Sequence, residues 1–438
     1  MKQYTSIGLG IPKFLLPQKD VDLSRWAVIA CDQFTSEPDY WEKVRLLVGD
    51  SPSTFHLTLP EVYLGKPEGE ERLRTINSNM GRYIHEGLLQ EYEGMVYIER
   101  TVAGQKRKGL LVCLDLEKYD YNQGSTSLIR ATEGTILDRL PPRIKIRENA
   151  SLELPHILVL IDDPGNIVMS AATRNIEELP LLYDFDLMLG SGHLSGWLIN
   201  AEELVEEIAD GLTHLAGLTT YRAKYNLPDA QDVLLYAMGD GNHSLATAKA
   251  IWEEHKEVLG LDHPSRYALV ELENVHDEGL EFEPIHRVLF EVKADIIIEI
   301  ETFFSGNAKL IPVSSLDEMK QMVAHSAAEK QYFGLLNSAG YWVIELDHPK
   351  LNLPVGNLQS FLDMLINSGG AVSIDYVHGE EAVKNLGMKP GNTGFYLPVM
   401  HKSELFKTVI LDGALPRKTF SMGEAKAKRF YLEARKIK

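Results

Sequence analysis

The sequence predicts a mixed α/β protein (α+β), in which helices flank a mixed sheet. Apolar runs of strand length recur along the chain, for example at residues 157–161 and 233–238. Stretches with apolar residues at helical spacing lie between them, as in the segment that begins at Asn200. This interleaving of the two patterns is typical of α/β proteins. No apolar run approaches the roughly 20 residues that cross a bilayer, so no membrane partner is expected.

The individual elements follow from local patterns of the same kind. Strands are expected at residues 26–30, 95–99, 109–115, 267–273 and 282–290. Helices are expected from Asp39 and from Asn200, the second with Glu203 in the capping-box position. The turn sequence Asp-Asp-Pro-Gly-Asn at 162–166 predicts a hairpin between residues 157–161 and 167–171. A last helix is expected from Ser421, with Glu424 three residues later.

The length of 438 residues predicts more than one domain. We expect a mixed α/β catalytic region at residues 1–295 and a further α/β region with a basic terminal helix at 296–438. Within this second region, residues 413–438 carry eight Lys or Arg and two Glu. This basic segment is either a solvated helix face, or its first residues, Arg417 and Lys418, reach an anionic ligand.

The overall charge and the cysteine content limit the class of protein. The formal net charge is −19, and so acidic a surface repels nucleic acid. The only cysteines, Cys31 and Cys113, provide neither a disulfide framework nor a metal-type cluster. The first residues lack the pattern of a signal peptide, so a cytoplasmic protein is expected.

The strongest chemical signal is the sequence Gly239-Asp240-Gly241-Asn242-His243-Ser244, which joins the apolar run 233–238 to a helical pattern. A strand that turns through glycines into a helix directs free backbone N–H groups and the helix dipole at one point, where an anion such as phosphate fits. Asn242 and Ser244 can cap the helix, and Gly239 and Gly241 permit close approach. Asp240 could hold Mg²⁺ or orient a hydroxyl, and His243 could bind phosphate or carry a proton. The alternative is that the glycines only make a tight turn and that His243 has a structural role.

Other charged residues could complete such a site. Asp32 and Glu37 lie in the first loop after a strand, and Glu133 and Arg139 lie in a segment punctuated by Gly and Pro. His286 and Arg287 lie within one predicted strand, so their side chains should point to opposite faces and only one should reach a given ligand.

Several of these segments resemble one family. Asp-Gly-x-His followed by a helix looks like the signature of the ParB/sulfiredoxin-like superfamily. More specifically, the chain resembles the bacterial and archaeal domain-of-unknown-function family 1015. That family has an Ala-Asp-Gly-His-His-Arg-Tyr type motif followed by a strand with a Pro-x-His-Arg element. The segments 239–244 and 280–287 of this chain match these two elements. Two further segments also resemble the family: 133–139, which contains Glu133-Gly134-Thr135 and Asp138-Arg139, and 415–419, which is Leu415-Pro416-Arg417-Lys418-Thr419.

The chain departs from the superfamily pattern at two positions. Ser244 replaces the motif arginine, so Arg139 or Arg287 is expected to supply the positive charge. Sulfiredoxins place a catalytic cysteine directly before the motif histidine, where this chain has Asn242. Sulfinic-acid repair is therefore not expected.

The resemblance implies a ParB/sulfiredoxin-like core and a function similar to that of the free serine kinases. The expected function is a small-molecule phosphotransferase, either a serine kinase that uses a nucleotide or pyrophosphate with Mg²⁺ or the reverse reaction on phosphoserine. A phosphatase for a small phosphate ester and a non-catalytic nucleotide-binding regulator are the alternatives. The expected partner is a small anionic ligand, with a homo-oligomer possible. The expected catalytic residues are Asp240, which also binds the metal, His243, Glu133 and Asp32; the expected phosphate ligands are Gly239, Gly241, Asn242, Ser244, Arg139, Arg287 and Lys418; the expected substrate ligands are His286 and Glu37.

Overall fold

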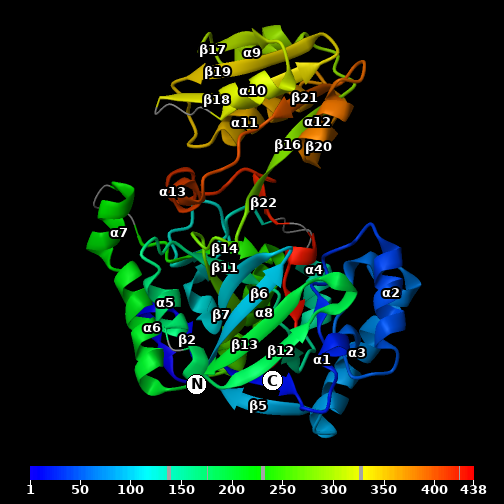
Figure 1. Ribbon diagram of the computed structural model, residues 1–438, viewed down its shortest axis with the longest axis vertical. Coiled ribbons are helices and arrows are strands. Elements are labelled where there is room, and N and C mark those ends of the chain that lie inside the picture. Colours follow the sequence, from blue (N-terminus) through cyan, green and yellow to red (C-terminus); the bar gives the residue numbers. More distant parts are fainter. Residues whose placement is uncertain (136–139, 175, 228–231, 325–328, 424) are drawn as a thin grey trace. The chain divides into compact units, whose positions relative to one another are not determined.

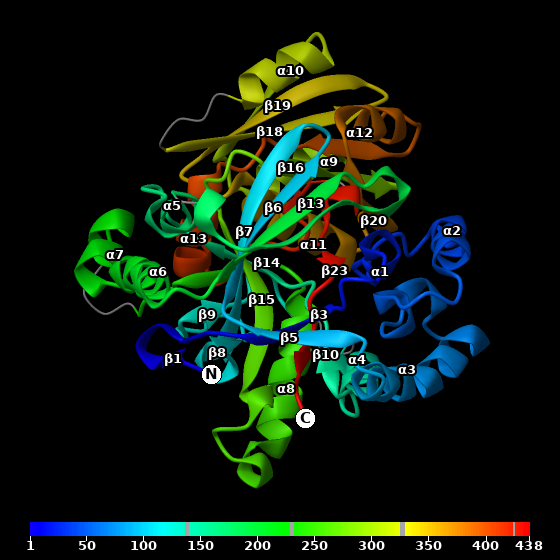
Figure 2. The same ribbon diagram turned by 60° about the horizontal axis from the view of Figure 1, so that its bottom comes forward.

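The computed structural model describes residues 1–135, 140–174, 176–227, 232–324, 329–423 and 425–438. The chain forms two compact units (Figures 1 and 2). The first unit contains Met1–Leu280 and Gly423–Lys438, and the second contains Glu281–Met422. The expected boundary was at residue 295. In the structure, the chain leaves the first unit after Leu280 and returns to it at Gly423.

A mixed sheet forms the centre of the first unit, with the strand order β12-β13-β6-β7-β15-β11-β14-β9-β8. β11 runs parallel to β15, and β9 runs parallel to both β14 and β8, whereas the other pairs along this order are antiparallel. The mixed α/β class is therefore confirmed, while a ParB/sulfiredoxin-like core remains a prediction. The strands are β6 (Met95–Val102), β7 (Gln105–Asp115), β8 (Tyr119–Asp120), β9 (Ile129–Arg130), β11 (Leu158–Ile161), β12 (Leu181–Asp186), β13 (His193–Ile199), β14 (Tyr236–Asp240) and β15 (Tyr267–Asn274), with β1 (Gln3–Tyr4) and β2 (Leu9–Gly10) at the side of β7.

Helices cover both faces of this sheet. Side chains alternate along a strand, so Leu111 and Cys113 of β7 face one hydrophobic core while Leu110 and Val112 face the other. The first core includes residues of α2 and α3, and the second includes residues of α5, α6 and α8 (Figure 1). The helices are α1 (Leu23–Trp26), α2 (Pro38–Val48), α3 (Pro67–His85), α4 (Leu140–Arg147), α5 (Ile167–Thr173), α6 (Glu202–Leu215), α7 (Leu218–Tyr225) and α8 (Asn242–Leu259).

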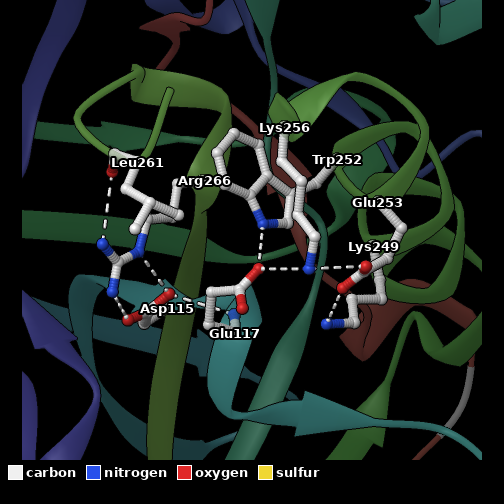
Figure 3. Close-up of polar contacts among 8 residues, drawn as sticks. All are labelled: Asp115, Glu117, Lys249, Trp252, Glu253, Lys256, Leu261 and Arg266. Carbon is white, nitrogen blue, oxygen red and sulfur yellow. Dashed lines mark hydrogen bonds and ion pairs between the residues drawn. The ribbon is translucent and has the colours of Figure 1, made fainter. Parts of the chain in front are cut away.

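Polar contacts attach α8, and the segment that follows it, to residues at and just after the end of β7 (Figure 3). The Trp252 indole Nε1 donates to Glu117 Oε1 at 2.5 Å, and Lys256 Nζ lies 3.3 Å from the same oxygen. Arg266, just before β15, donates to both carboxylate oxygens of Asp115 at the end of β7, at 3.0 and 2.6 Å. Bidentate Arg–carboxylate pairs fix orientation as well as distance. The Glu117 contacts hold α8 in place, and the Arg266–Asp115 pair fixes the start of β15 against the end of β7.

The second unit contains its own sheet, ordered β17-β19-β18-β21-β16-β20, with β22 paired to the start of β16. Its strands are β16 (Phe282–Phe290), β17 (Ala308–Val313), β18 (Lys330–Asn337), β19 (Gly340–Asp347), β20 (Ser373–His378), β21 (Thr393–Tyr396) and β22 (Phe420–Met422). Its helices are α9 (Ile296–Phe303), α10 (Leu316–Val323), α11 (Pro354–Asn367), α12 (Glu380–Gly387) and α13 (Lys402–Asp412).

The hairpin predicted between residues 157–161 and 167–171 is wrong. β11 is followed by the helix α5, and Asp163 Oδ2 accepts from the backbone N–H of Val168 at 2.9 Å in the first turn of that helix. Turn residues end a strand, but they do not determine whether a strand or a helix follows. Asn200 also does not cap α6, since Ala201 occupies the N-cap position.

The predicted basic terminal helix is also wrong. The segment contains β22, a 3-10 turn (Ala425–Ala427), β23 (Phe430–Tyr431) and β24 (Arg435–Lys436), and the expected cap residue Glu424 lies outside the described residues. β23 pairs with β4 (Val28–Ile29), and β24 pairs with β10 (Leu152–Glu153). Two of its basic residues, Arg429 and Arg435, are buried and paired with carboxylates, rather than lying on a solvated face. Among the described helices, none is long and apolar enough to cross a membrane.

Candidate active site

The turn between β14 and α8 has the strand–turn–helix form that its sequence predicts. β14 ends at Asp240, Gly241 occupies the N-cap position with φ of 80°, and α8 begins at Asn242. A Cβ atom at position 241 would lie 3.1 Å from the backbone Cα of Ile157. Position 241 therefore requires glycine for two reasons. Its backbone is left-handed, and Ile157, just before β11, approaches too closely to leave room for a side chain.

The hydrogen bonds of α8 begin at Gly241. The carbonyl oxygen of Gly241 accepts from the N–H groups of Ser244 at 2.9 Å and Leu245 at 3.1 Å. The backbone N–H groups before Ser244 therefore lie at the positive end of the helix, ahead of the intrahelical hydrogen bonds. The helix dipole favours an anion at this position.

Asp240 at the end of β14 is paired with a cation from the C-terminal segment. Lys428 Nζ lies 3.1 Å from Asp240 Oδ2, and the N–H of Gly241 donates to Asp240 Oδ1 at 2.9 Å. Burial acts to raise the pKa of Asp240, but the charge and hydrogen bond of Lys428 outweigh it and hold that pKa below its ordinary value. The turn thus presents an ionised carboxylate and a lysine beside the helix terminus.

Ser244 begins a chain of hydrogen bonds that leads away from α8. Its Oγ lies 2.9 Å from His156 Nε2, and His156 Nδ1 lies 3.0 Å from the hydroxyl of Tyr431 on β23. The same Tyr431 oxygen accepts from the backbone N–H of Cys31 at 3.2 Å. Because β23 pairs with β4, this chain connects the motif helix to the loop that contains Asp32.

Asp32 belongs to a second charged group in that loop. The half-buried Asp32 adjoins Glu61, whose backbone N–H donates to the carbonyl of Cys31 at 2.8 Å and whose carboxylate pairs with Arg143. Burial raises the pKa of Glu61, Arg143 opposes that rise, and the negative charge of Asp32 adds to it. Glu37 instead lies at the N-cap of α2 with its side chain exposed.

Glu133 follows β9, the parallel neighbour of β14. Arg130 pairs with Ala237, and Thr132 Oγ1 donates to the carbonyl of Met238 at 2.7 Å. The carboxyl ends of β9 and β14 therefore lie together, and Glu133 lies at the same end of the sheet as Asp240. Arg139 is outside the described residues.

The remaining expected ligands, His286, Arg287 and Lys418, belong to the second unit. His286 is buried, stacks on Tyr396 at 4.5 Å and accepts from the N–H of Leu397 at 3.1 Å. Arg287 is fully buried and donates to the carbonyls of Ile285 and Arg417. These contacts are with protein groups. Lys418 is exposed, with φ of 56°.

Sequence reasoning missed the residues that complete the site. His156, Lys428 and Tyr431, together with Glu61 and Arg143, carry no motif of their own and come from distant segments. The basic character of residues 413–438 was the one available signal, and it indicated Arg417 and Lys418 rather than Lys428.

Within the described part of the chain, no group of three or more His, Cys, Asp or Glu side chains could hold a metal ion. Mg²⁺ at a phosphate site usually requires only one or two carboxylates, since phosphate oxygens and water supply the other ligands. Asp240 and Asp32 are carboxylates of that kind.

Comparison with solved structures finds distant likenesses. A conserved hypothetical protein from Pyrococcus furiosus is 13% identical, with a TM-score of 0.34 over 74% of this chain and 90% of that one. A free serine kinase in complex with AMP is 12% identical, with a TM-score of 0.37 over 75% and 91%. SbnI from Staphylococcus aureus, truncated at its C-terminus, is 10% identical, with a TM-score of 0.31 over 72% and 82%. Likenesses this low do not extend to a site or an activity.

No curated protein matches the chain. Residues 15–365, which are most of the chain and include the β14–α8 turn, match the family described as "Protein of unknown function (DUF1015)". The resemblance seen in the sequence is thereby confirmed, and the chain belongs to the DUF1015 family.

Proposed function

We propose that this protein is a phosphotransferase that moves a phosphoryl group between a nucleotide or pyrophosphate and the hydroxyl of a small molecule, with serine the first acceptor to test. The observation that carries the proposal is the pairing of Asp240 with Lys428 beside the N-terminus of α8. A helix N-terminus, a cation and a carboxylate thus meet at one turn.

Phosphoryl transfer requires positioning and charge neutralisation more than covalent chemistry from the protein. The N-terminus of α8, which begins at Asn242, binds phosphate oxygens. Lys428 exchanges its contact with Asp240 for a contact with phosphate and so offsets the charge that develops on the transferred group. Lys428 in this way provides the positive charge that Ser244 cannot.

A carboxylate must also accept the proton of the attacking hydroxyl. Asp32 and Glu133 are the candidates, since each lies in a loop tied to the motif by hydrogen bonds. Glu61 is less suited because Arg143 already pairs with its carboxylate. Mg²⁺ bound with the nucleotide would contact Asp240 or Asp32 and would supply further charge neutralisation.

The test is to incubate the protein with Mg²⁺, serine and each of ATP, ADP or pyrophosphate, and to measure phosphoserine by mass spectrometry. Asp240→Asn should lose turnover, whereas Asp262→Asn, at an exposed position beyond α8, should keep it. Absence of both turnover and binding with every donor contradicts the proposal.

The same assay separates the two alternatives. Release of phosphate from phosphoserine without an acceptor would identify a phosphatase. Tight nucleotide binding without any product would identify a regulatory nucleotide-binding protein.

A further inference from the structure

A chain of hydrogen bonds at the start of α8 has no role in the reaction described above. It connects the side chains of Ser244, His156 and Tyr431. Ser244 Oγ is 2.9 Å from His156 Nε2, and His156 Nδ1 is 3.0 Å from the Tyr431 hydroxyl. The Tyr431 ring meets the His156 ring edge-on, with centroids 5.4 Å apart and planes at 81°. A hydroxyl, an imidazole within hydrogen-bond reach and a third group that orients the imidazole are the parts of an activated nucleophile.

Either tautomer of His156 fits these distances, and only one of them makes His156 a base for Ser244. The Tyr431 oxygen accepts from the N–H of Cys31 at 3.2 Å and can also accept from His156. With the hydrogen on Nδ1, His156 donates to Tyr431, and Nε2 accepts the Ser244 hydroxyl hydrogen, as a general base must.

The position of Ser244 suits attack on a phosphate. Ser244 lies in the first turn of α8, where its N–H is held by Gly241, and its side chain is only half-buried. The helix dipole and the Lys428–Asp240 pair lie at the same turn. A phosphoryl group on Ser244 would therefore lie where negative charge is stabilised.

We infer that Ser244 is a covalent nucleophile that carries the phosphoryl group between donor and acceptor, with His156 as its base. The inference rests on the proposed function and adds an intermediate to it. In the first step the bond between Ser244 Oγ and the terminal phosphorus of ATP forms, and the bond from that phosphorus to ADP breaks. The Ser244 proton passes to His156 Nε2.

The second step reverses the roles. The acceptor hydroxyl attacks the phosphorus and loses its proton to a carboxylate, Asp32 or Glu133. The bond to Ser244 Oγ breaks, and that oxygen recovers its proton from His156. The sum is one acceptor phosphorylated, one ADP formed and one proton released.

The experiment measures the phosphorylated protein and the course of the reaction together. Wild-type protein is mixed with ATP and Mg²⁺ without an acceptor, quenched, digested and sequenced by mass spectrometry. One phosphoryl group is expected on Ser244, released when serine is added. Transfer from ATP with a chiral terminal phosphate should proceed with overall retention, because two displacements each invert the phosphorus.

Variants distinguish chemistry from folding. Ser244→Ala should abolish labelling and lower kcat at least about 100-fold, and His156→Gln should slow labelling by about 10²–10⁴-fold, the usual contribution of a general base. Ser195→Ala, which alters a hydroxyl bonded to Asp184 on β13, is the matched control and should label normally. Thermal unfolding of each variant checks that it is folded.

The outcomes separate this inference from the function on which it rests. Turnover with inversion at phosphorus, or unchanged kcat in Ser244→Ala, overturns the covalent intermediate and leaves the phosphotransferase standing. Absence of both label and turnover with every donor overturns the phosphotransferase and the intermediate together.

Discussion

Some residues of the candidate site can be predicted from the sequence, and others cannot. Asp240 and Ser244 can be predicted because they lie in a glycine-rich turn between a strand pattern and a helix pattern. Lys428 and His156 are not, because each reaches the turn from a strand or loop that is far away in the sequence. Arg287 is a plausible phosphate ligand by residue type, but it is fully buried among groups of its own unit. The residue type predicts the chemistry of a side chain, whereas its burial decides whether a ligand can reach that side chain.

Lys428 is expected to contribute directly to nucleotide binding. Lys428→Met removes the cation at the α8 terminus and leaves Asp240 to repel phosphate. Hydrogen bonds to charged groups contribute about 1.5–3 kcal/mol, so the Kd for ATP should rise by about 10- to 100-fold. Isothermal titration calorimetry measures this, with exposed Lys426→Met as the control. An unchanged Kd in Lys428→Met would rule out the proposed cation.

His286 is expected to make the second unit sensitive to acid. Burial, and then the charge of Arg287, lower the pKa of His286 to about 4, and its Nδ1 accepts from the N–H of Leu397. The unfolded chain, in which the pKa of His is about 6.5, binds this proton more readily than the folded one. Stability is therefore fully present above about pH 6.5 and is lost as pH falls towards 4.

The His286→Asn variant retains an acceptor at this position but cannot titrate. Urea unfolding followed by Trp342, the tryptophan of the second unit, should show a shallower loss of stability between pH 6.5 and 4. His401→Asn, at an exposed position just before α13, should behave as wild type. Equal pH dependence in all three proteins would show that His286 is not the titrating group.

At the scale of elements, strongly periodic segments were predicted well and punctuated ones were not. The β14–α8 turn and the strands β6 and β7 follow from apolar runs and glycines. The segment after β11 was misread because Asp-Asp-Pro-Gly-Asn begins α5 and not a second strand. The prediction for the basic C-terminal segment is wrong because its arginines pair with buried carboxylates that are distant in sequence, Glu271 and Glu153, which a helical pattern cannot show.

Gly241 is expected to set the geometry of the turn. Gly241→Ala places a Cβ against Ile157 in a left-handed backbone, which by itself costs about 1–2 kcal/mol. Gly104→Ala, in the β6–β7 turn at φ of 83°, bears a similar backbone cost with nothing within 4 Å of the new atom. Chemical denaturation should show a greater loss for Gly241→Ala, and only that variant should bind ATP more weakly. Equal losses of stability and unchanged binding would contradict the close approach at Ile157.

At the scale of the whole molecule, the second unit is inserted into the first. The C-terminal segment returns to the first unit and supplies both Lys428 and Tyr431 to the candidate site. The two ends of the second unit lie side by side, since Phe282 pairs with Met422 in an antiparallel ladder. Length predicts more than one domain, but it does not predict the return of the chain, because that return depends on strand pairs between residues about 400 positions apart.

Because its ends are adjacent, the second unit should be removable as a piece. Paired residues of antiparallel strands lie about 5 Å apart, so a short Gly-Ser linker can join Leu280 to Gly423. This shortened chain should unfold cooperatively, whereas residues 1–295 alone should not, because they lack the segment that covers Glu271 and Glu153. Circular dichroism during thermal unfolding compares the two chains. Cooperative folding of residues 1–295 would contradict the role given to the C-terminal segment.

The most direct test of the central claim is a crystal structure of the protein with a non-hydrolysable ATP analogue and Mg²⁺. The account predicts a phosphate group at the N-terminus of α8, which begins at Asn242, in contact with Lys428. Phosphate bound elsewhere, with the Lys428–Asp240 pair intact, would contradict it.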